Sequence, residues 1–159
     1  MSGDSQVIER SVALADLGAT DLLGARIAAA LHVGDAVALE GDLGAGKTTL
    51  ARAILHALGV TEEVPSPTFT LVQYYETARL PVRHYDLYRI ENPSEVEELG
   101  LDEALDEGAA LIEWPERALT WMPPGRLHVA MRLRDGTRSA RISGPPRWAD
   151  AIAGMSHAG

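Results

Sequence analysis

An eight-residue phosphate-loop motif constrains this chain more than any other feature. Residues 41–48 have the sequence GDLGAGKT, which fits the pattern G-x-x-x-x-G-K-[ST] without a mismatch. Lys47 is also the only lysine, because the other basic residues are arginines. In this pattern the backbone N–H groups form a concave anion site, and the lysine ammonium reaches the β- and γ-phosphates of a nucleotide. The motif therefore predicts a phosphate-binding turn between a strand and a helix.

The flanking residues provide the context that this motif requires. An apolar run at 36–40 predicts a buried strand, and residues 47–58 predict a helix whose core stripe includes Leu50 and Ile54. A helix in this place directs the positive end of its dipole at the phosphates. The residues expected to bind the nucleotide are the loop and the first helical turn: Asp42, Leu43, Gly44, Ala45, Gly46, Lys47, Thr48 and Thr49.

Strands alternate with helices along most of the chain and end in a late hairpin. This order predicts an α/β fold, a single P-loop NTPase domain with a mixed, mostly parallel central sheet flanked by helices. A helix is expected from Thr20, whose hydroxyl suits an N-cap. The other expected elements are an edge strand at 6–12, strands at 68–75, 82–88 and 109–113, an acidic helical stretch after Pro93, a hairpin of 127–133 and 138–142 around Asp135-Gly136, and a closing helix at 147–155.

Composition excludes several other classes of protein. A chain of 159 residues predicts one domain, 1–159, with residues 1–5 and 156–159 disordered. The absence of cysteine excludes disulfides and thiolate sites. Neither a secretory signal nor a membrane span is evident, so we expect a soluble, cytoplasmic protein.

Charge is distributed unevenly along the chain. The net charge of −9 argues against tight independent binding to nucleic acid. Residues 126–159, however, carry six arginines and two acids. This distribution predicts either a local basic face or the polar faces of strands that happen to carry arginine. The stretch 91–107 contains eight acids and no base, which indicates a solvated helix face or a surface for a basic partner.

Two acids compete for a role beside the phosphate loop. Glu113 ends an apolar run, so it is expected at the carboxyl end of a core strand, where open α/β sheets bind ligands, although it could equally be a strand-end carboxylate that faces solvent. Asp86 lies on an alternating strand and could equally be an exposed residue or a salt-bridge partner. His84 on the same strand is more often structural than catalytic.

Two further features lie near these acids in the sequence. The segment 66–70, Ser66-Pro67-Thr68-Phe69-Thr70, is a hydroxyl-bearing loop where a nucleotide switch would lie, or a plain lead into a strand. Trp114 follows Glu113 directly, and it is either a base-stacking residue or a core aromatic residue at the sheet edge.

Four motifs together resemble the bacterial TsaE family, also called YjeE, whose members are ATPases needed for the threonylcarbamoyl modification of adenosine in tRNA. The motifs are GDLGAGKTT at 41–49, SPTFTLV at 66–72, HYDLYR at 84–89 and IEWPE at 112–116. They occur in the family's order and cover the chain from about Thr20 to Arg117. The last forty residues match only in general character.

The resemblance implies roles that the spacing of residues does not reveal. It implies ATP and Mg²⁺ as cofactors, with Thr48 and Glu113 holding the metal and Asp86 needed for hydrolysis. It implies that Ser66, Pro67 and Thr68 belong to a switch that senses the γ-phosphate. It also implies that Trp114 lies at the active site, and Thr20 is a further candidate contact. The implied partners are the TsaB and TsaD proteins, with tRNA reached only indirectly.

Two other activities use the same loop. A small-molecule or nucleoside kinase is the alternative, although such enzymes usually add a mobile lid with arginines, and the arginines here lie far downstream. A GTPase would need an Asn-Lys-x-Asp element, which is impossible when Lys47 is the only lysine.

Overall fold

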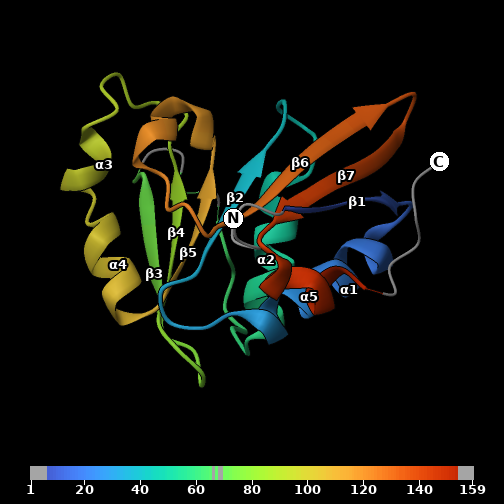
Figure 1. Ribbon diagram of the computed structural model, residues 1–159, viewed down its shortest axis with the longest axis horizontal. Coiled ribbons are helices and arrows are strands. Elements are labelled where there is room, and N and C mark those ends of the chain that lie inside the picture. The colour runs from blue at the N-terminus through green and yellow to red at the C-terminus, as the bar shows by residue number, and fades with distance from the viewer. Residues whose placement is uncertain (1–6, 66, 68–69, 154–159) are drawn as a thin grey trace, which may run out of the picture.

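The described part of the chain folds around one sheet of seven strands. The structure is a computed structural model that describes residues 7–65, 67 and 70–153 (Figure 1). The predicted disorder of residues 1–5 and 156–159 concerns residues outside these ranges. No helix within them is long and apolar enough to cross a membrane.

Most strands of the sheet run in one direction. Across the sheet they are β1 (Ile8–Leu14), β7 (Thr137–Gly144), β6 (Leu127–Arg134), β2 (Ala36–Glu40), β5 (Ala109–Glu113), β4 (Val82–Asp86) and β3 (Val72–Tyr75). The four strands β6, β2, β5 and β4 pair in parallel. The pairs β1–β7, β7–β6 and β4–β3 are antiparallel, so only β7 and β3 run against the others. The predicted mixed, mostly parallel sheet is confirmed.

Helices cover the two faces of the sheet unequally (Figure 1). One face packs against α1 (Leu17–Ala30), α2 (Lys47–Ala57) and α5 (Ala149–Ile152), which form a single core with β1, β2, β6 and β7. The other face packs against α3 (Glu95–Glu98), α4 (Leu101–Glu107) and the 3-10 segment η2 (Pro115–Trp121), and this second core lies over β4 and β5. The same face of β6, β7 and β1 carries exposed or half-buried side chains.

Burial along the strands follows from this covering. Every residue of β5 is buried, as expected of a parallel strand with both faces covered. In β6 the buried Leu127, Val129 and Met131 alternate with residues that are half-buried or exposed, as expected of a strand with one solvated face.

The predicted hairpin is confirmed at its turn. Arg134 pairs with Thr137, so the loop has two residues, and Asp135 and Gly136 have φ angles of 54° and 78°. Two positive φ angles define the type I′ turn that matches the twist of antiparallel strands, and an Asp-Gly pair adopts it readily.

Several predicted boundaries were wrong by two residues, such as those of β1, expected at 6–12, and the end of β4, expected at 88. Three further boundaries differ for reasons that the structure shows. The first helix begins at Leu17 rather than near Thr20, because Asp16 is the N-cap and its carboxylate accepts a 2.8 Å hydrogen bond from the Ala19 N–H. Strand β3 begins at Val72, since Leu71 has a φ of 69° that is incompatible with a strand. The closing helix begins as the 3-10 segment η3 (Pro146–Trp148) and continues as α5 only to Ile152.

Candidate nucleotide-binding site

The predicted phosphate loop connects the carboxyl end of β2 to the amino end of α2. Gly46 is the N-cap of α2 and has a φ of 107°, a left-handed conformation that a residue with a Cβ adopts only with strain. Its carbonyl already accepts the first helical hydrogen bond, from the Leu50 N–H at 2.9 Å. The glycines of the motif are therefore required by the backbone path.

Lys47 is buried behind this loop. Its ammonium donates to the backbone carbonyl of Gly41, donates at 3.0 Å to that of Asp42, and lies 4.3 Å from the centre of the Trp114 ring. Burial lowers the pKa of Lys47 below its ordinary value, and the nearby carboxylates, Glu113 foremost, only partly offset this shift. An anion beside this buried ammonium therefore stabilises its charged form.

Thr48, Glu113 and His84 form a buried hydrogen-bonded chain. The Thr48 hydroxyl lies 3.0 Å from both carboxylate oxygens of Glu113, and the Nε2 of His84 lies 2.7 Å from Oε2. His84 is fully buried and Glu113 is 2% exposed. The hydroxyl and the imidazole both contact the carboxylate, which fixes its plane against the start of α2. Hydrogen bonds to a charged group each contribute about 1.5–3 kcal/mol.

Asp86 lies beside Glu113 at the ends of neighbouring strands. The two residues are direct partners in the parallel register of β4 and β5. Asp86 is buried, and its Oδ1 accepts a 3.0 Å hydrogen bond from the Tyr88 N–H. Both acids for which the sequence left alternatives are thus buried beside the phosphate loop, rather than exposed to solvent.

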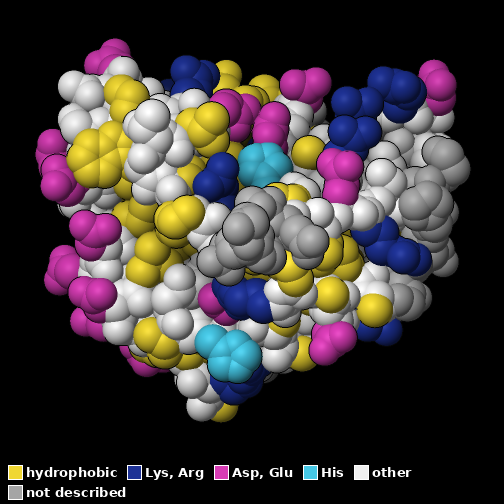
Figure 2. Space-filling model, in the orientation of Figure 1, with side chains coloured by type: hydrophobic (Ala, Val, Ile, Leu, Met, Phe, Trp, Pro, Cys, Tyr) yellow, Lys and Arg dark blue, Asp and Glu magenta, His cyan; other side chains and the backbone are white. Residues whose placement is uncertain are grey.

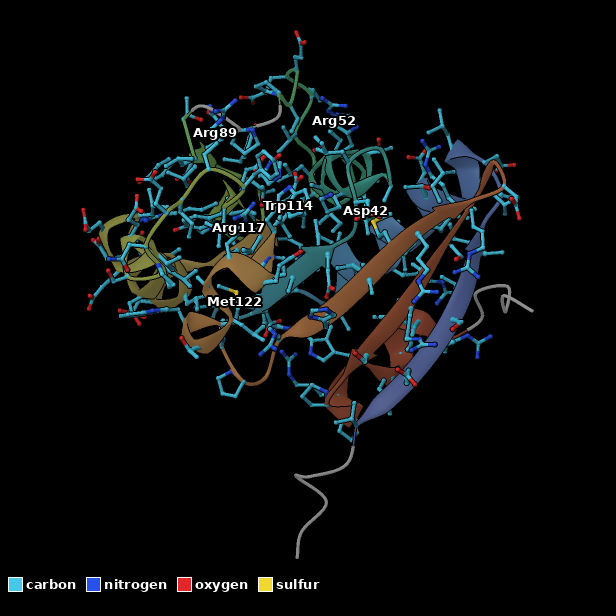
Figure 3. All side chains as sticks on the ribbon, turned by 90° about the horizontal axis from the view of Figure 1, so that it is seen from above. Asp42, Arg52, Arg89, Trp114, Arg117 and Met122 are labelled. Carbon is cyan, nitrogen blue, oxygen red and sulfur yellow. The ribbon has the colours of Figure 1, made fainter. Side chains whose placement is uncertain are left out.

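Trp114 adopts an uncommon backbone conformation next to these acids. Its φ is 62° and its ψ is 50°, and its ring lies 4.8 Å from that of Tyr88, centre to centre. A bulky residue in the left-handed region costs on the order of 1–3 kcal/mol, and such strain is concentrated at functional sites. Figure 3 labels Trp114 and shows it in the middle of the molecule, between η2 and the loop that carries Asp42.

These side chains surround a cavity of about 230 Å³. Six of the eight residues predicted to bind the nucleotide line it, whereas Asp42 and Ala45 line a neighbouring hollow. The residues lining the cavity are Leu43, Gly44, Gly46, Lys47, Thr48, Thr49, Asp86, Glu113, Trp114 and Arg138. The cavity is therefore lined both by the Lys47 ammonium of the loop and by the carboxylates of Asp86 and Glu113, which come from two neighbouring strands.

The donor set of this cavity fits Mg²⁺. The described residues contain no cluster of three or more His, Asp or Glu side chains that could hold a metal ion without help. Protein sites for Mg²⁺ usually supply only one or two carboxylates, and substrate phosphates and waters complete the octahedron. The Thr48 hydroxyl and the Glu113 carboxylate, side by side at the mouth of the loop, are suitable oxygen donors for this arrangement.

Thr20 lies outside this cavity but in the next one. A second pocket, of about 240 Å³, is lined by Thr20 and Asp16 from the start of α1. It shares Gly46, Thr49 and Arg138 with the first cavity. The two pockets therefore meet at the amino end of α2.

The predicted switch is only partly within the described residues. Ser66 and Thr68 lie outside them, and Pro67 is not among the described residues that line the cavity. The Pro67 carbonyl accepts a 2.7 Å hydrogen bond from the Leu71 N–H, and the Leu71 carbonyl accepts one of 3.0 Å from the Asp86 N–H. The described end of the segment is thus tied to the strand that carries Asp86.

Two residues of the site were missed by sequence reasoning. His84 was treated as structural, yet it lies two residues before Asp86, and the period of two in a strand places both side chains on one face of β4. Arg138 lines both pockets, and its Nη2 donates to the Gly44 carbonyl at 3.2 Å. No local signal marks Arg138, because the β6–β7 hairpin brings it back to a loop more than ninety residues earlier.

The fold and this loop define an α/β protein of the phosphate-loop class. The particular family follows from comparison with known proteins. The family described as threonylcarbamoyl adenosine biosynthesis protein TsaE matches residues 14–142, and the chain belongs to that family.

Individual relatives agree with this assignment. The tRNA threonylcarbamoyladenosine biosynthesis protein TsaE of Nostoc sp. is 40% identical over 151 residues, which cover 90% of this chain and 92% of the relative. The protein of the same name from Rickettsia felis is 42% identical over 117 residues, covering 73% and 68% respectively. The crystal structure of YdiB from Bacillus subtilis superposes with a TM-score of 0.77 at 29% identity, covering 92% of this chain and 93% of that one.

Proposed function

We propose that this protein is a Mg²⁺-dependent ATPase that supports the threonylcarbamoyl modification of adenosine in tRNA. The observation that carries the proposal is the convergence of Lys47, Thr48 and Glu113 on one cavity, in a chain of the TsaE family. A buried cation and a hydroxyl–carboxylate pair at the amino end of a helix are suited to binding a nucleotide triphosphate with its metal.

Lys47 supplies the charge that holds the β- and γ-phosphates. Without a ligand its ammonium is satisfied by two backbone carbonyls and the Trp114 ring. Phosphate oxygens are stronger acceptors for a cation than neutral carbonyls, so the ammonium turns toward the phosphates when ATP binds. Because the lysine is already buried, little of its hydration is left to lose on binding.

Thr48 and Glu113 would hold Mg²⁺, which neutralises charge on the β- and γ-phosphates when it is bound. Glu113 is kept in place for this role by His84, whose Nε2 lies 2.7 Å from the carboxylate. A second ligand shell of this kind fixes the orientation of a metal-binding carboxylate before the metal arrives.

Asp86 would act in hydrolysis itself. Its carboxylate lines the cavity beside Glu113, where it can accept a hydrogen bond from a water directed at the γ-phosphate. Ser66, Pro67 and Thr68 would form the switch, because the chain that follows them is hydrogen-bonded to the backbone of Asp86 through Leu71.

The two remaining candidates contact opposite ends of the nucleotide. Trp114 would contact the phosphate end, since its ring already lies over Lys47. Thr20 would contact the nucleoside end, since it lines the adjoining pocket on the far side of Gly46 and Thr49. This arrangement favours Trp114 as a phosphate-side residue rather than a base-stacking one.

Proteins TsaB and TsaD would be the partners, and tRNA would be reached through them. A chain with a net charge of −9 is poorly suited to hold tRNA alone, so a partner must supply most of that contact. A role in tRNA modification is the reason for which we expect the protein to act in the cytoplasm. The kinase alternative gains no support, because the reported family and relatives are named for biosynthesis of the modified nucleoside.

The test is ATP hydrolysis by the purified protein with and without TsaB and TsaD. We expect slow Mg²⁺-dependent hydrolysis alone and faster hydrolysis when both partners are present. Lys47→Ala provides the control for contaminating ATPases and should be inactive in both conditions. Hydrolysis that instead depends on an added nucleoside, with a phosphorylated nucleoside as product, would show that the protein is a kinase.

A further inference from the structure

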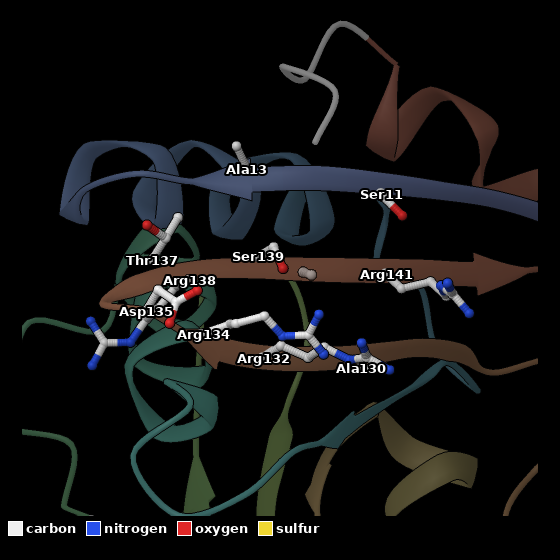
Figure 4. Close-up of a pocket in the computed structure, with 11 residues that line it drawn as sticks. Ser11, Ala13, Ala130, Arg132, Arg134, Asp135, Thr137, Arg138, Ser139 and Arg141 are labelled. Atoms are coloured by element: carbon white, nitrogen blue, oxygen red, sulfur yellow. The ribbon is translucent and has the colours of Figure 1, made fainter. Parts of the chain in front are cut away.

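A further cavity, separate from the nucleotide site, is a groove on the side of the sheet formed by β6, β7 and β1. Its volume is about 520 Å³, and it runs along the face of β1, β7 and β6 that no described helix covers (Figure 4). Four of the thirteen arginines line it: Arg132, Arg134, Arg138 and Arg141. We call this surface, with the small residues on its floor, the arginine groove.

The alternation of small and long side chains forms the groove. On the solvated face of the strands, Ser11, Ala13, Ala130 and Ser139 provide a low floor. Arg132 and Arg134 are two residues apart on β6, so their side chains project from the same face about 7 Å apart. Figure 4 shows these two arginines and Arg141 beside the small residues of the floor. The walls of the groove are thus guanidinium groups.

The guanidinium groups of the groove are largely available. Arg132 and Arg134 are exposed, and neither makes an ion pair with any described carboxylate. Arg141 has only a 3.8 Å contact with Glu9, and both side chains are more than half exposed. An exposed pair of this kind contributes about 0–1 kcal/mol, so an incoming anion can replace it.

We propose that the arginine groove docks a carboxylate-rich segment of a protein partner. Arginine forms paired, planar hydrogen bonds with carboxylates, and the small floor leaves room for a peptide backbone between the walls. Nucleic acid fits less well, because proteins that bind it tightly contact about six to ten phosphates. Only four arginines line the groove, Asp135 and Glu9 lie at its rim, and the α3–α4 side of the molecule is lined with acids (Figure 2).

Arg138 lies between the arginine groove and the nucleotide site. It is the one residue that lines the groove, the phosphate cavity and the Thr20 pocket alike among the described residues. Its guanidinium donates to Gly44 of the phosphate loop. The period of two along β7 places the Arg138 side chain with the buried Ala140 and Ile142, on the face opposite to Arg141. Its guanidinium therefore belongs to the nucleotide site, and the guanidinium groups that the groove itself presents are those of Arg132, Arg134 and Arg141. The inference rests on the proposed function for the identity of the partner, which is then the TsaB–TsaD pair.

The first experiment tests the groove without any assumption about the partner. A fluorescein-labelled oligoglutamate peptide is titrated with the wild-type protein, with the double variant Arg132→Glu/Arg134→Glu, and with tRNA as competitor. The control is Leu22→Glu/Val33→Glu/Leu119→Glu/Leu17→Glu, which changes the net charge equally at exposed apolar residues outside the groove. Melting curves verify that each variant is folded.

We expect the peptide to bind the wild type and the control, more weakly as salt rises, and to bind the groove variant at least tenfold more weakly. Equal binding to the wild type and the groove variant would overturn the proposal. So would tRNA that binds the wild type more tightly than the peptide and loses binding in the groove variant. Self-association of the wild type that the groove variant abolishes, with no peptide binding, would identify a second copy as the occupant instead.

The second experiment tests the identity of the partner. ATP hydrolysis is measured while the concentration of the TsaB–TsaD pair is raised. Arg132→Glu/Arg134→Glu should keep the basal rate and need at least tenfold more of the pair for half-maximal stimulation. An unchanged requirement would overturn the role of the groove in partner docking. Absence of basal Lys47-dependent hydrolysis would instead refute the proposed ATPase activity. The peptide titration would then still test whether the arginine groove binds carboxylates.

Discussion

The two halves of the sheet differ in what covers them. On the side of β5 and β4, which we call the closed half, helices or the 3-10 segment η2 pack on both faces, and β5 is buried throughout. On the side of β6, β7 and β1, which we call the open half, only one face is covered, and the other face carries arginines and small residues. The two carboxylates of the candidate site, Asp86 and Glu113, come from the closed half.

We expect this difference to separate the place of ATP hydrolysis from the place of partner binding. Charge stabilisation is stronger where water is excluded, so a site for phosphate transfer gains from the closed half. A surface that must bind and release a partner needs side chains that are already solvated, and the open half provides them. We therefore expect variants of Asp86 or Glu113 to change hydrolysis with no partner present, whereas variants of Arg132, Arg134 or Arg141 should change only the response to a partner.

The largest effect is expected for Lys47→Ala. Loss of the cation that faces the phosphates should lower basal ATP hydrolysis by about 10²–10³-fold, in line with the removal of other preorganised donors. Lys47→Arg is the matched control for charge. It should also be inactive, because the planar guanidinium group of arginine cannot replace the compact ammonium of lysine in the narrow loop. Substantial ATP hydrolysis by Lys47→Ala would contradict the proposal that this cavity is the nucleotide site.

Asp86→Asn should come next in size. The amide oxygen can still accept from the Tyr88 N–H, so the local fold is retained, but the carboxylate that positions water is lost. We expect kcat to fall by about 10²-fold, within the range for general acid–base groups, with ATP affinity nearly unchanged. Calorimetric titration with a non-hydrolysable ATP analogue measures the affinity. A variant that loses both binding and its melting transition would show that Asp86 is structural.

Arg138→Ala should have a smaller effect, because Arg138 lies on β7 but its side chain lines the nucleotide cavity. Removing one guanidinium from the rim of the phosphate cavity should weaken ATP affinity by about tenfold, equivalent to one charge-assisted hydrogen bond. Arg141→Ala is the matched control, because it lies on the same strand and lines only the arginine groove. Equal losses in the two variants would mean that bulk charge rather than position is responsible.

The smallest effect is a change in how stability depends on pH. Burial lowers the pKa of Lys47 in the folded state, so above that pKa the unfolded state binds more protons than the folded state. The free energy of unfolding should therefore rise with pH until the ordinary lysine pKa of about 10.4 is passed. Chemical denaturation of the nucleotide-free protein should show this rise, and Lys47→Met should reduce it. The same slope in both proteins would contradict a perturbed Lys47.

The closed half could be predicted from sequence more completely than the open half. A continuous apolar run identified β5 and placed Glu113 at its carboxyl end, and the glycine spacing identified the phosphate loop. These signals are local, because they concern neighbours along the chain. The partnership of Glu113 with Thr48 and His84 depends instead on strand order, which no local pattern specifies.

On the open half, the alternation along β6 predicted a half-buried strand but not what its exposed face would form. The groove exists because β7 pairs on one side with β6, which carries Arg132 and Arg134, and on the other side with β1, whose small residues lie more than a hundred residues earlier in the chain. The start of α1 was misplaced for a simpler reason, since the prediction relied on Thr20, although Asp16 is the stronger N-cap residue and caps the helix.

The presence of a single lysine has a consequence for covalent chemistry. Lys47 carries the only side-chain amine of the protein, and its lowered pKa makes the neutral, nucleophilic form more abundant than in an ordinary lysine. Acetylation, carbamylation or any lysine-directed label therefore has one internal target, at the phosphate cavity. A single such event would disable the site, and bound nucleotide would shield the amine from it.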